Sequence, residues 1–327
     1  MQNRKVGLII ALSSCLACFL LFVILIVNLI GGIGRSSISH QSSSLLEDLI
    51  DVLSIEGGIG ETTSSMFATS YYDHQFIINS LSTLIDDPSS KGLIVFIDSP
   101  GGSVYHTDEI YLKLLEYKST GRPVYASFGS TAASGGYYIG CAADKIICNR
   151  NTLTGSIGVI MQNIIDISGL YEKLGIKVET ITAGENKAMG SGYEPLTDEQ
   201  RTILQSMLDE THTQFIEVVS EGRNLSLEEA RKLADGRIYT AKQALENGLV
   251  DQLGNFEDTV TIMRESQDLM DLPLNYIEQA PLSFFDTLLL KLPNLTPKTE
   301  LSAILELESN INKFGYYCIS PLGNSSY

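Results

Sequence analysis

Ser134 and Lys187 are the candidate nucleophile and base, because a serine hydroxyl and a lysine amine could together carry out covalent chemistry. Ser134 lies in the sequence Ala-Ala-Ser-Gly-Gly, and Lys187 ends the sequence Gly-Glu-Asn-Lys. No histidine lies between His106 and His212 to act as a base for this serine. A serine hydroxyl becomes a good nucleophile when a neighbouring group takes its proton, and a neutral lysine amine in a desolvated site can do so. The pair predicts serine-lysine catalysis, a variant of the catalytic triad.

Two glycine turns could supply the groups that stabilise a negatively charged oxygen. Gly101 and Gly102 end the turn Asp-Ser-Pro-Gly-Gly, and Gly135 follows Ser134 at the start of an expected helix. Glycines let backbone N–H groups approach a bound carbonyl without a Cβ in the way, which is the geometry of an oxyanion hole. The alternatives are an ordinary strand-to-helix turn and, for Ser134, a helix N-cap.

A third turn, at residues 152–159, is rich in hydroxyl groups and contains Ser156. A lysine that acts as a base needs an acceptor that orients its lone pair, and the Ser156 hydroxyl could be that acceptor. The alternative is a turn serine whose hydroxyl is satisfied locally.

Short apolar runs alternate with longer helical patterns, which predicts an α/β domain with mostly parallel strands. The expected strands are residues 52–55, 92–97, 123–127, 145–148, 159–162 and 177–182. The expected helices are residues 73–85, 105–117, 135–143, 168–174 and 197–222. The last of these begins with a capping box, Thr197 to Gln200.

The N-terminus predicts a membrane anchor. Residues 6–30 carry no charge, and this run is longer than the roughly 20 apolar residues that cross a bilayer. Basic residues precede it, so the positive-inside rule places the N-terminus in the cytoplasm and the rest outside. We expect a cytoplasmic tip and anchor at residues 1–33, a flexible tether at 34–50, a folded domain at 51–266 and a peripheral segment at 267–327.

Composition excludes some classes of function. The chain has 22 Lys and Arg residues against 39 Asp and Glu residues, a net charge of -17. A nucleic acid would be repelled by this charge, so we expect no nucleic-acid partner. The five cysteines are too few for a disulfide scaffold and have no zinc-site spacing, so we expect small buried side chains and no metal or cofactor.

The motifs together resemble the short form of the signal peptide peptidase A family, membrane-anchored bacterial serine proteases. The resemblance runs over residues 51–266. It rests on residues 99–102, 132–138, 153–159, 184–187, 235–240 and 248–251. It departs from the expected pattern beside the lysine, where Glu185 and Asn186 precede it and Ala188 and Met189 follow.

The resemblance implies a ClpP/crotonase-like fold and a role for each candidate residue. Ser134 matches the nucleophile and Lys187 the general base. Backbone N–H groups of Gly101, Gly102 and Gly135 match the oxyanion donors, and Ser156 matches a hydroxyl that contacts the lysine.

The resemblance also implies a homo-oligomeric ring or dome. In a chain of this length the serine and the lysine are expected to meet across a subunit contact. The implied location is the bacterial cell membrane, with a single span and an extracytoplasmic catalytic domain. The implied substrates are remnant signal peptides left in the membrane after secretion.

Three alternatives share the fold. They are a ClpP-like protease, a crotonase-type enzyme acting on acyl thioesters, and a catalytically inactive membrane scaffold. A ClpP-like triad would need a histidine about 25 residues after Ser134, where this chain has Ile157, Gly158 and Val159. An extracytoplasmic location argues against the thioester enzyme, and the presence of both Ser134 and Lys187 argues against the scaffold.

Overall fold

A computed structural model describes residues 47–60, 72–161, 164–279 and 314–317. The chain divides into two compact units, and nearly all the described residues belong to the second, Asp48–Tyr327. Within the described ranges, no helix combines the length and the apolar character needed to cross a bilayer. The anchor expected at residues 6–30 lies outside those ranges.

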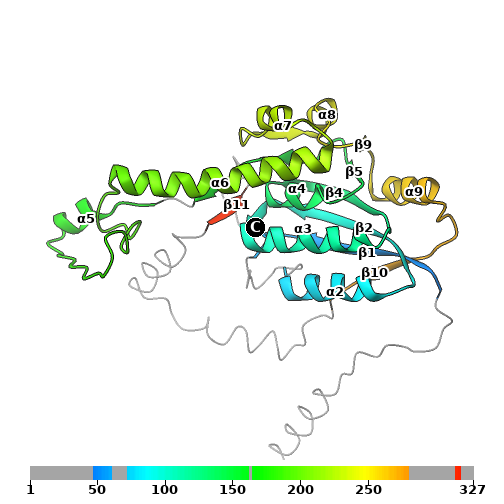
Figure 1. Cartoon of the computed structure of the whole chain (residues 1–327), viewed down its shortest axis with the longest axis horizontal. Coiled ribbons are helices and arrows are strands. Elements are labelled where there is room, and N and C mark those ends of the chain that lie inside the picture. Colours follow the sequence, from blue (N-terminus) through cyan, green and yellow to red (C-terminus); the bar gives the residue numbers. More distant parts are fainter. Residues whose placement is uncertain (1–46, 61–71, 162–163, 280–313, 318–327) are drawn as a thin grey trace, which may run out of the picture. The chain divides into compact units, whose positions relative to one another are not determined.

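An eight-stranded mixed sheet forms the centre of this unit (Figure 1). The main path runs β10-β1-β2-β4-β5-β9, and all its neighbours are parallel, as the alternating sequence pattern predicts. β6 pairs parallel with β4 and antiparallel with β8. The strands are β1 Leu49–Glu56, β2 Ser90–Ser99, β4 Val124–Ala133, β5 Lys145–Cys148, β6 Leu153–Gly155, β8 Ile238–Thr240, β9 Gln252–Leu253 and β10 Leu274–Ile277.

Both faces of the sheet are covered, so its strands are nearly continuous apolar runs. Leu93 and Val95 of β2 belong to the larger buried cluster, together with residues of α2, α3 and α4. Ile94 lies between them in sequence and joins Val260 and Met263 of α9 in the second cluster. The helices are α2 His74–Asp86, α3 Val104–Ser119, α4 Gly135–Gly140 and α9 Phe256–Gln267.

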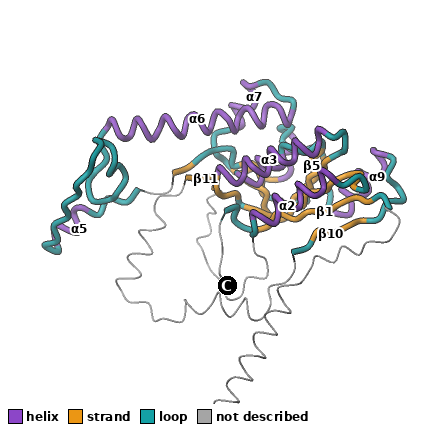
Figure 2. The backbone as a smooth tube through the Cα atoms, turned by 60° about the horizontal axis from the view of Figure 1, so that its bottom comes forward, coloured by secondary structure: helices purple, strands orange, loops and turns teal. Residues whose placement is uncertain are grey.

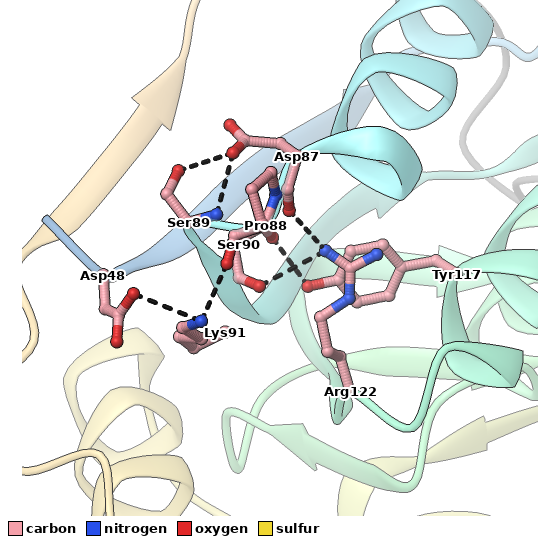
Figure 3. A network of polar contacts seen from close by, with 8 residues as sticks. All are labelled: Asp48, Asp87, Pro88, Ser89, Ser90, Lys91, Tyr117 and Arg122. Atoms are coloured by element: carbon pink, nitrogen blue, oxygen red, sulfur yellow. Dashed lines mark hydrogen bonds and ion pairs between the residues drawn. The ribbon is translucent and has the colours of Figure 1, made fainter. Parts of the chain in front are cut away.

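Arg122 ties the end of α2 to the sheet (Figure 3). Its guanidinium donates to the carbonyl oxygens of Leu84 at 2.9 Å, Ile85 at 2.7 Å and Asp87 at 2.9 Å. The group also lies over the Tyr117 ring, 4.3 Å from its centroid. A helix leaves its last carbonyls without intrahelical partners, so this arginine satisfies them and fixes α2 beside α3.

The longest helix, α6 (Asp198–Arg223), packs on the core through its C-terminal half only. Phe215, Ile216, Val218 and Val219 are buried, whereas none of residues 198–214 is. The short helix α5 (Ser168–Lys173) lies near the other end of α6 (Figures 1 and 2). Two further helices, α7 (Leu227–Leu233) and α8 (Ala241–Glu246), follow α6.

A second, three-stranded sheet has the order β3-β11-β7, and β11 is antiparallel to both neighbours. β3 is Gly101–Ser103, β7 is Ile160–Met161 and β11 is Phe314–Tyr317. Both β10 and β11 come from the segment expected to be peripheral, so the folded unit continues past residue 266.

Most expected elements are present, with two differences. The strand predicted at residues 177–182 is wrong, because these residues form no strand and are exposed. A strand depends on packing against neighbours, and Val178 and Ile181 are 45% and 91% exposed. The helix predicted at 135–143 ends at Gly140.

Candidate active site

Ser134 occupies a strained turn between a strand and a helix. β4 ends at Ala133, α4 begins at Gly135, and Ser134 itself has φ 54° and ψ -118°. Its N–H donates to the carbonyl oxygen of Gly155 at 2.7 Å. Its hydroxyl is buried and has no hydrogen-bond partner among the described residues. Sharp strand-to-helix turns of this kind present nucleophilic serines, and strain of this kind gathers at functional sites.

Ser156 lies at the same edge of the sheet as Ser134, because each follows the end of its strand. The strands β4 and β6 are parallel, and Ala133 is paired with Gly155, the residue before Ser156. Ser156 is buried, has φ 49°, and donates its N–H to the carbonyl oxygen of Arg237 at 2.8 Å. The motif that contains Arg237 therefore holds the Ser156 backbone in place.

The glycines predicted as oxyanion donors converge beside Ser134. A methyl group on Gly135 would lie 3.2 Å from the Cα of Gly101 and 3.3 Å from the nitrogen of Gly102. A side chain here would force its neighbours to move apart. The N–H of Gly101 already donates to the Ser99 hydroxyl at 3.1 Å. This narrows the candidate oxyanion donors to Gly102 and Gly135.

Thr107 and Asp98 also contribute to this site, although the sequence did not predict a role for either residue. The same methyl group on Gly135 would lie 2.7 Å from the Thr107 hydroxyl oxygen, which is buried without a hydrogen-bond partner in the described ranges. Asp98 accepts hydrogen bonds from the Ser130 hydroxyl at 2.8 Å and the Thr131 N–H at 2.9 Å. It therefore ties the end of β2 to the strand that carries Ser134. In the sequence, the place of Asp98 at the start of the turn at residues 98–102 is the feature that could have indicated this role.

The matched motif at residues 248–251 makes contacts with α4, β5 and α6. The Tyr137 hydroxyl donates to the carbonyl oxygen of Leu249 at 2.9 Å. Asp251 accepts from the Ile146 N–H at 2.7 Å and pairs with the buried Arg223 at 2.8 Å. The Tyr137 contact holds α4, which begins directly after Ser134, and the Asp251 contacts join β5 to α6.

Lys187 is not brought to Ser134 within one chain. It is exposed and lies in a turn before the N-terminal end of α6, and Glu185 is exposed as well. α4 contacts the other half of α6, because the ring of Tyr138 lies 5.0 Å from that of Phe215. The helix between Asp198 and Phe215 is roughly 25 Å long at 1.5 Å per residue. No ion pair among the described side chains joins Glu185 to Lys187.

The segment that carries Lys187 exposes an unusual amount of apolar surface. Large aliphatic side chains between 43% and 91% exposed are Ile165, Leu170, Leu174, Ile176, Val178 and Ile181. A soluble monomer rarely exposes so many large aliphatic side chains on one segment. This surface is therefore typical of a site of contact with another protein.

The two cysteines in the described ranges are not competing nucleophiles. Cys141 and Cys148 are buried and unpaired with each other. Burial raises the pKa of the Cys141 thiol to about 12 and that of Cys148 to about 11. Both are protonated at neutral pH, so the expectation of small buried side chains is confirmed for these two.

Comparison with known proteins identifies the family. The model of peptidase family S49 matches residues 116–270. The putative signal peptide peptidase SppA of Enterococcus faecium is 36% identical over 276 residues, covering 78% of this chain and 80% of that protein. A putative protease of Synechocystis is 42% identical over 182 residues, covering 56% of this chain and 65% of that protein.

A more distant relative is much longer. The chloroplastic serine protease SPPA of Arabidopsis thaliana is 31% identical over 200 residues, which cover 61% of this chain and 29% of that protein. The match to the Enterococcus protein covers most of both chains. The chain belongs to peptidase family S49 and is a serine protease.

Proposed function

We propose that the protein is a membrane-anchored endopeptidase that uses Ser134 and Lys187 to degrade remnant signal peptides, on a ClpP/crotonase-like fold. The observation that carries the proposal is the turn at Ser134. There a buried hydroxyl without a partner in the described chain lies beside the closely packed Gly102 and Gly135.

The geometry supports an acyl-enzyme mechanism. A neutral Lys187 amine takes the Ser134 proton as the hydroxyl oxygen attacks the peptide carbonyl. The N–H groups of Gly102 and Gly135 donate to the resulting oxyanion. The lysine ammonium then gives its proton to the departing amine, which leaves an ester on Ser134. Water hydrolyses the ester in the same way, with the lysine as base, and the serine hydroxyl is restored.

The lysine in this mechanism comes from a neighbouring subunit. Within one chain Lys187 is exposed on the segment around α5, and the Ser134 hydroxyl has no partner among the described residues. The apolar surface around Lys187 supports a contact with a second copy, which would complete the site and desolvate the amine. A head-to-tail contact of this kind closes into a ring when a whole number of its rotations makes a full turn.

The membrane anchor and the substrate class rest on sequence. The uncharged run at residues 6–30 supports a single span with the catalytic domain outside the cytoplasm. The related Enterococcus protein carries the name putative signal peptide peptidase SppA. Remnant signal peptides would reach such an anchored enzyme within the plane of the membrane.

Cleavage of a synthetic signal peptide by the detergent-solubilised full chain tests the proposal, with products identified by mass spectrometry. Ser134→Ala and Lys187→Arg should each lose nearly all activity, because a guanidinium does not deprotonate in proteins. Ser206→Ala changes an exposed helix serine and serves as the matched control. Full activity of correctly assembled Lys187→Arg would contradict the mechanism.

The topology has its own test. Protease added to intact spheroplasts should digest the catalytic domain. Protection of the domain until the cells are lysed would place it in the cytoplasm and contradict the proposed location.

A further inference from the structure

The N-terminal half of α6 reaches from the core toward α5 (Figures 1 and 2). Lys187 lies in the turn before this half, none of residues 198–214 is buried, and Phe215 is the first buried residue of the helix. The direction of this exposed half therefore decides where the lysine is presented. Gln214 stands at its boundary with the core, directly before Phe215.

Gln214 joins α6 to two other helices through its side-chain amide. Its Nε2 group donates to the Tyr138 hydroxyl oxygen at 2.9 Å and to Asp108 Oδ1 at 3.1 Å. The Tyr138 hydroxyl in turn donates to the same Asp108 oxygen at 2.6 Å. Both atoms that face Gln214 are therefore acceptors, and its two N–H groups match them. These three side chains form a junction of α3, α4 and α6.

Tyr138 gives this junction a rigid reference point. Its side chain is completely buried, and its ring lies 5.1 Å from that of Tyr111 and 5.0 Å from that of Phe215. Its N–H donates to the carbonyl oxygen of Ser134 at 2.9 Å, so Tyr138 lies one helical turn after the candidate nucleophile. The junction therefore ties the direction of α6 to the helix that presents Ser134.

A small change in the direction of α6 has a large effect at its far end. The helix between Asp198 and Phe215 is roughly 25 Å long, so a tilt of about 2° moves its N-terminal end by about 1 Å. A displacement of about 1 Å in a catalytic group can cost about a hundredfold in rate. Apolar packing is non-directional, whereas hydrogen bonds depend on angle. Hydrogen bonds at the boundary are thus the contacts suited to fix this direction.

We propose that Gln214 is a positioning residue that sets the direction of the exposed half of α6 and so places Lys187 in the active site of the neighbouring subunit. This inference rests on the proposed function, since it takes Lys187 as the base for the Ser134 of another chain. In a ring of identical contacts, every chain carries its lysine to the next serine by the same step. The angle between α4 and α6 is part of that step, and Asp108 and Tyr138 hold it through Gln214.

Substitutions in the full chain separate these hydrogen bonds from packing. Gln214→Leu keeps a side chain of similar size and helix propensity but removes both donors. Gln214→Glu puts a second carboxylate beside Asp108, and adding Asp108→Asn exchanges the two groups and restores a donor opposite an acceptor. Gln205→Leu is the matched control, because Gln205 is exposed on the same helix and donates to Asp209 of that helix at 2.7 Å.

The first readout is the kinetics of peptide cleavage. Gln214→Leu and Gln214→Glu should each lower kcat at least about tenfold and leave KM unchanged, because a displaced base slows the chemical step and not substrate binding. The exchanged pair should recover to within about threefold of wild type. Gln214 is exposed, so the unfolding temperature should change by no more than about 4 °C. A kcat in Gln214→Leu equal to that of the Gln205→Leu control would overturn the inference.

Mixed assemblies show which active site Gln214 serves. Chains with Ser134→Ala supply the lysine, and chains with Lys187→Arg supply the serine. Adding Gln214→Leu to the lysine-supplying chain should lower the kcat of the mixture at least about tenfold. The same change in the serine-supplying chain should cause no loss, because the α6 of that chain carries an arginine and takes part in no active pair. An equal loss in both mixtures, or a loss confined to the serine-supplying chain, would overturn the inference.

The parental mixture of Ser134→Ala and Lys187→Arg chains separates this inference from the proposed function. Cleavage by that mixture, with a loss that follows Gln214→Leu in the lysine-supplying chain, supports both. Cleavage with any other distribution of the loss overturns the positioning role alone. A parental mixture that stays inactive, although native mass spectrometry verifies co-assembly, overturns the shared active site and the role of Gln214 with it.

Discussion

Ser134 and Ser156 directly follow Ala133 and Gly155, which are opposite each other on the parallel strands β4 and β6. Both serines have positive φ, 54° and 49°. The Ser134 N–H donates to the carbonyl oxygen of Gly155 at 2.7 Å, directly before Ser156. Parallel strands that end together bring their following residues to the same edge of a sheet. The two serines that the proposed mechanism assigns to the site therefore follow the ends of neighbouring strands at one edge of the sheet.

Two substitutions of Ser156 distinguish the role of its hydroxyl in catalysis from the role of its backbone conformation in stability. Ser156→Ala and Ser156→Gly both remove the group expected to orient the lysine, so each should lower kcat/KM about tenfold to a hundredfold. Glycine tolerates positive φ, whereas alanine does not, so the glycine variant should be more stable by about 1 kcal/mol. Thermal unfolding and peptide cleavage check the two effects. Wild-type activity in Ser156→Gly would show that the hydroxyl has no role.

Gly135→Ala tests the close packing behind the nucleophile. Its methyl group would lie 2.7 Å from the Thr107 hydroxyl oxygen and 3.2 Å from the Cα of Gly101. Thr107 and the backbone at Gly101 must give way together, so cleavage should fall at least about a hundredfold, as on loss of an oxyanion donor. Gly169→Ala is the control, because no atom lies within 4 Å of its added methyl group. Equal activity in the two variants would contradict the proposed oxyanion hole.

Asp51→Asn tests the link between β1 and β10. Asp51 is buried, and it accepts a hydrogen bond from the Asn275 side chain at 2.7 Å. Burial raises the pKa of the Asp51 carboxyl above its usual range, despite opposing hydrogen bonds from Ser90 and Asn275. The folded state therefore holds the proton more tightly than the unfolded state, so ionisation of Asp51 costs stability above its unfolded pKa.

The sign of this effect fixes the expected result. Asp51→Asn should unfold at a higher temperature than wild type at pH 7, because it cannot ionise. Its advantage should shrink as the pH falls through the folded pKa of Asp51, where the wild-type side chain becomes neutral. Unfolding temperatures measured from pH 7 down to pH 4 check this. A stability difference that grows on acidification would contradict it.

Local signals in the sequence predicted the elements that local chemistry determines. The capping box at the start of α6 is present, with the Gln200 N–H donating to the Thr197 hydroxyl at 3.1 Å and the Thr197 N–H donating to the Gln200 side chain at 3.2 Å. Apolar runs with glycine turns likewise predicted β2 and β4. Such features need only neighbouring residues to be recognised.

The pairing of distant segments was not predictable, even where a strand was expected, as at residues 159–162. β3, β7 and β11 have two to four residues each, and β11 pairs with residues more than 150 positions earlier. Nothing in so short a strand specifies its partner. Thr107 was missed because the pattern of α3 does not show which residue of its first turn meets Gly135. The roles of Ser134, Lys187, Ser156 and the glycines stay predictions until they are measured.

The central claim is that the serine of one chain acts with the lysine of another. Its most direct test mixes inactive Ser134→Ala and Lys187→Arg chains, allows the subunits to exchange, and measures peptide cleavage after co-assembly is verified by native mass spectrometry. Some contacts then join an intact serine to an intact lysine, and random mixing in a ring predicts about a quarter of wild-type activity. Mixed assemblies with no more activity than either variant alone would contradict the claim.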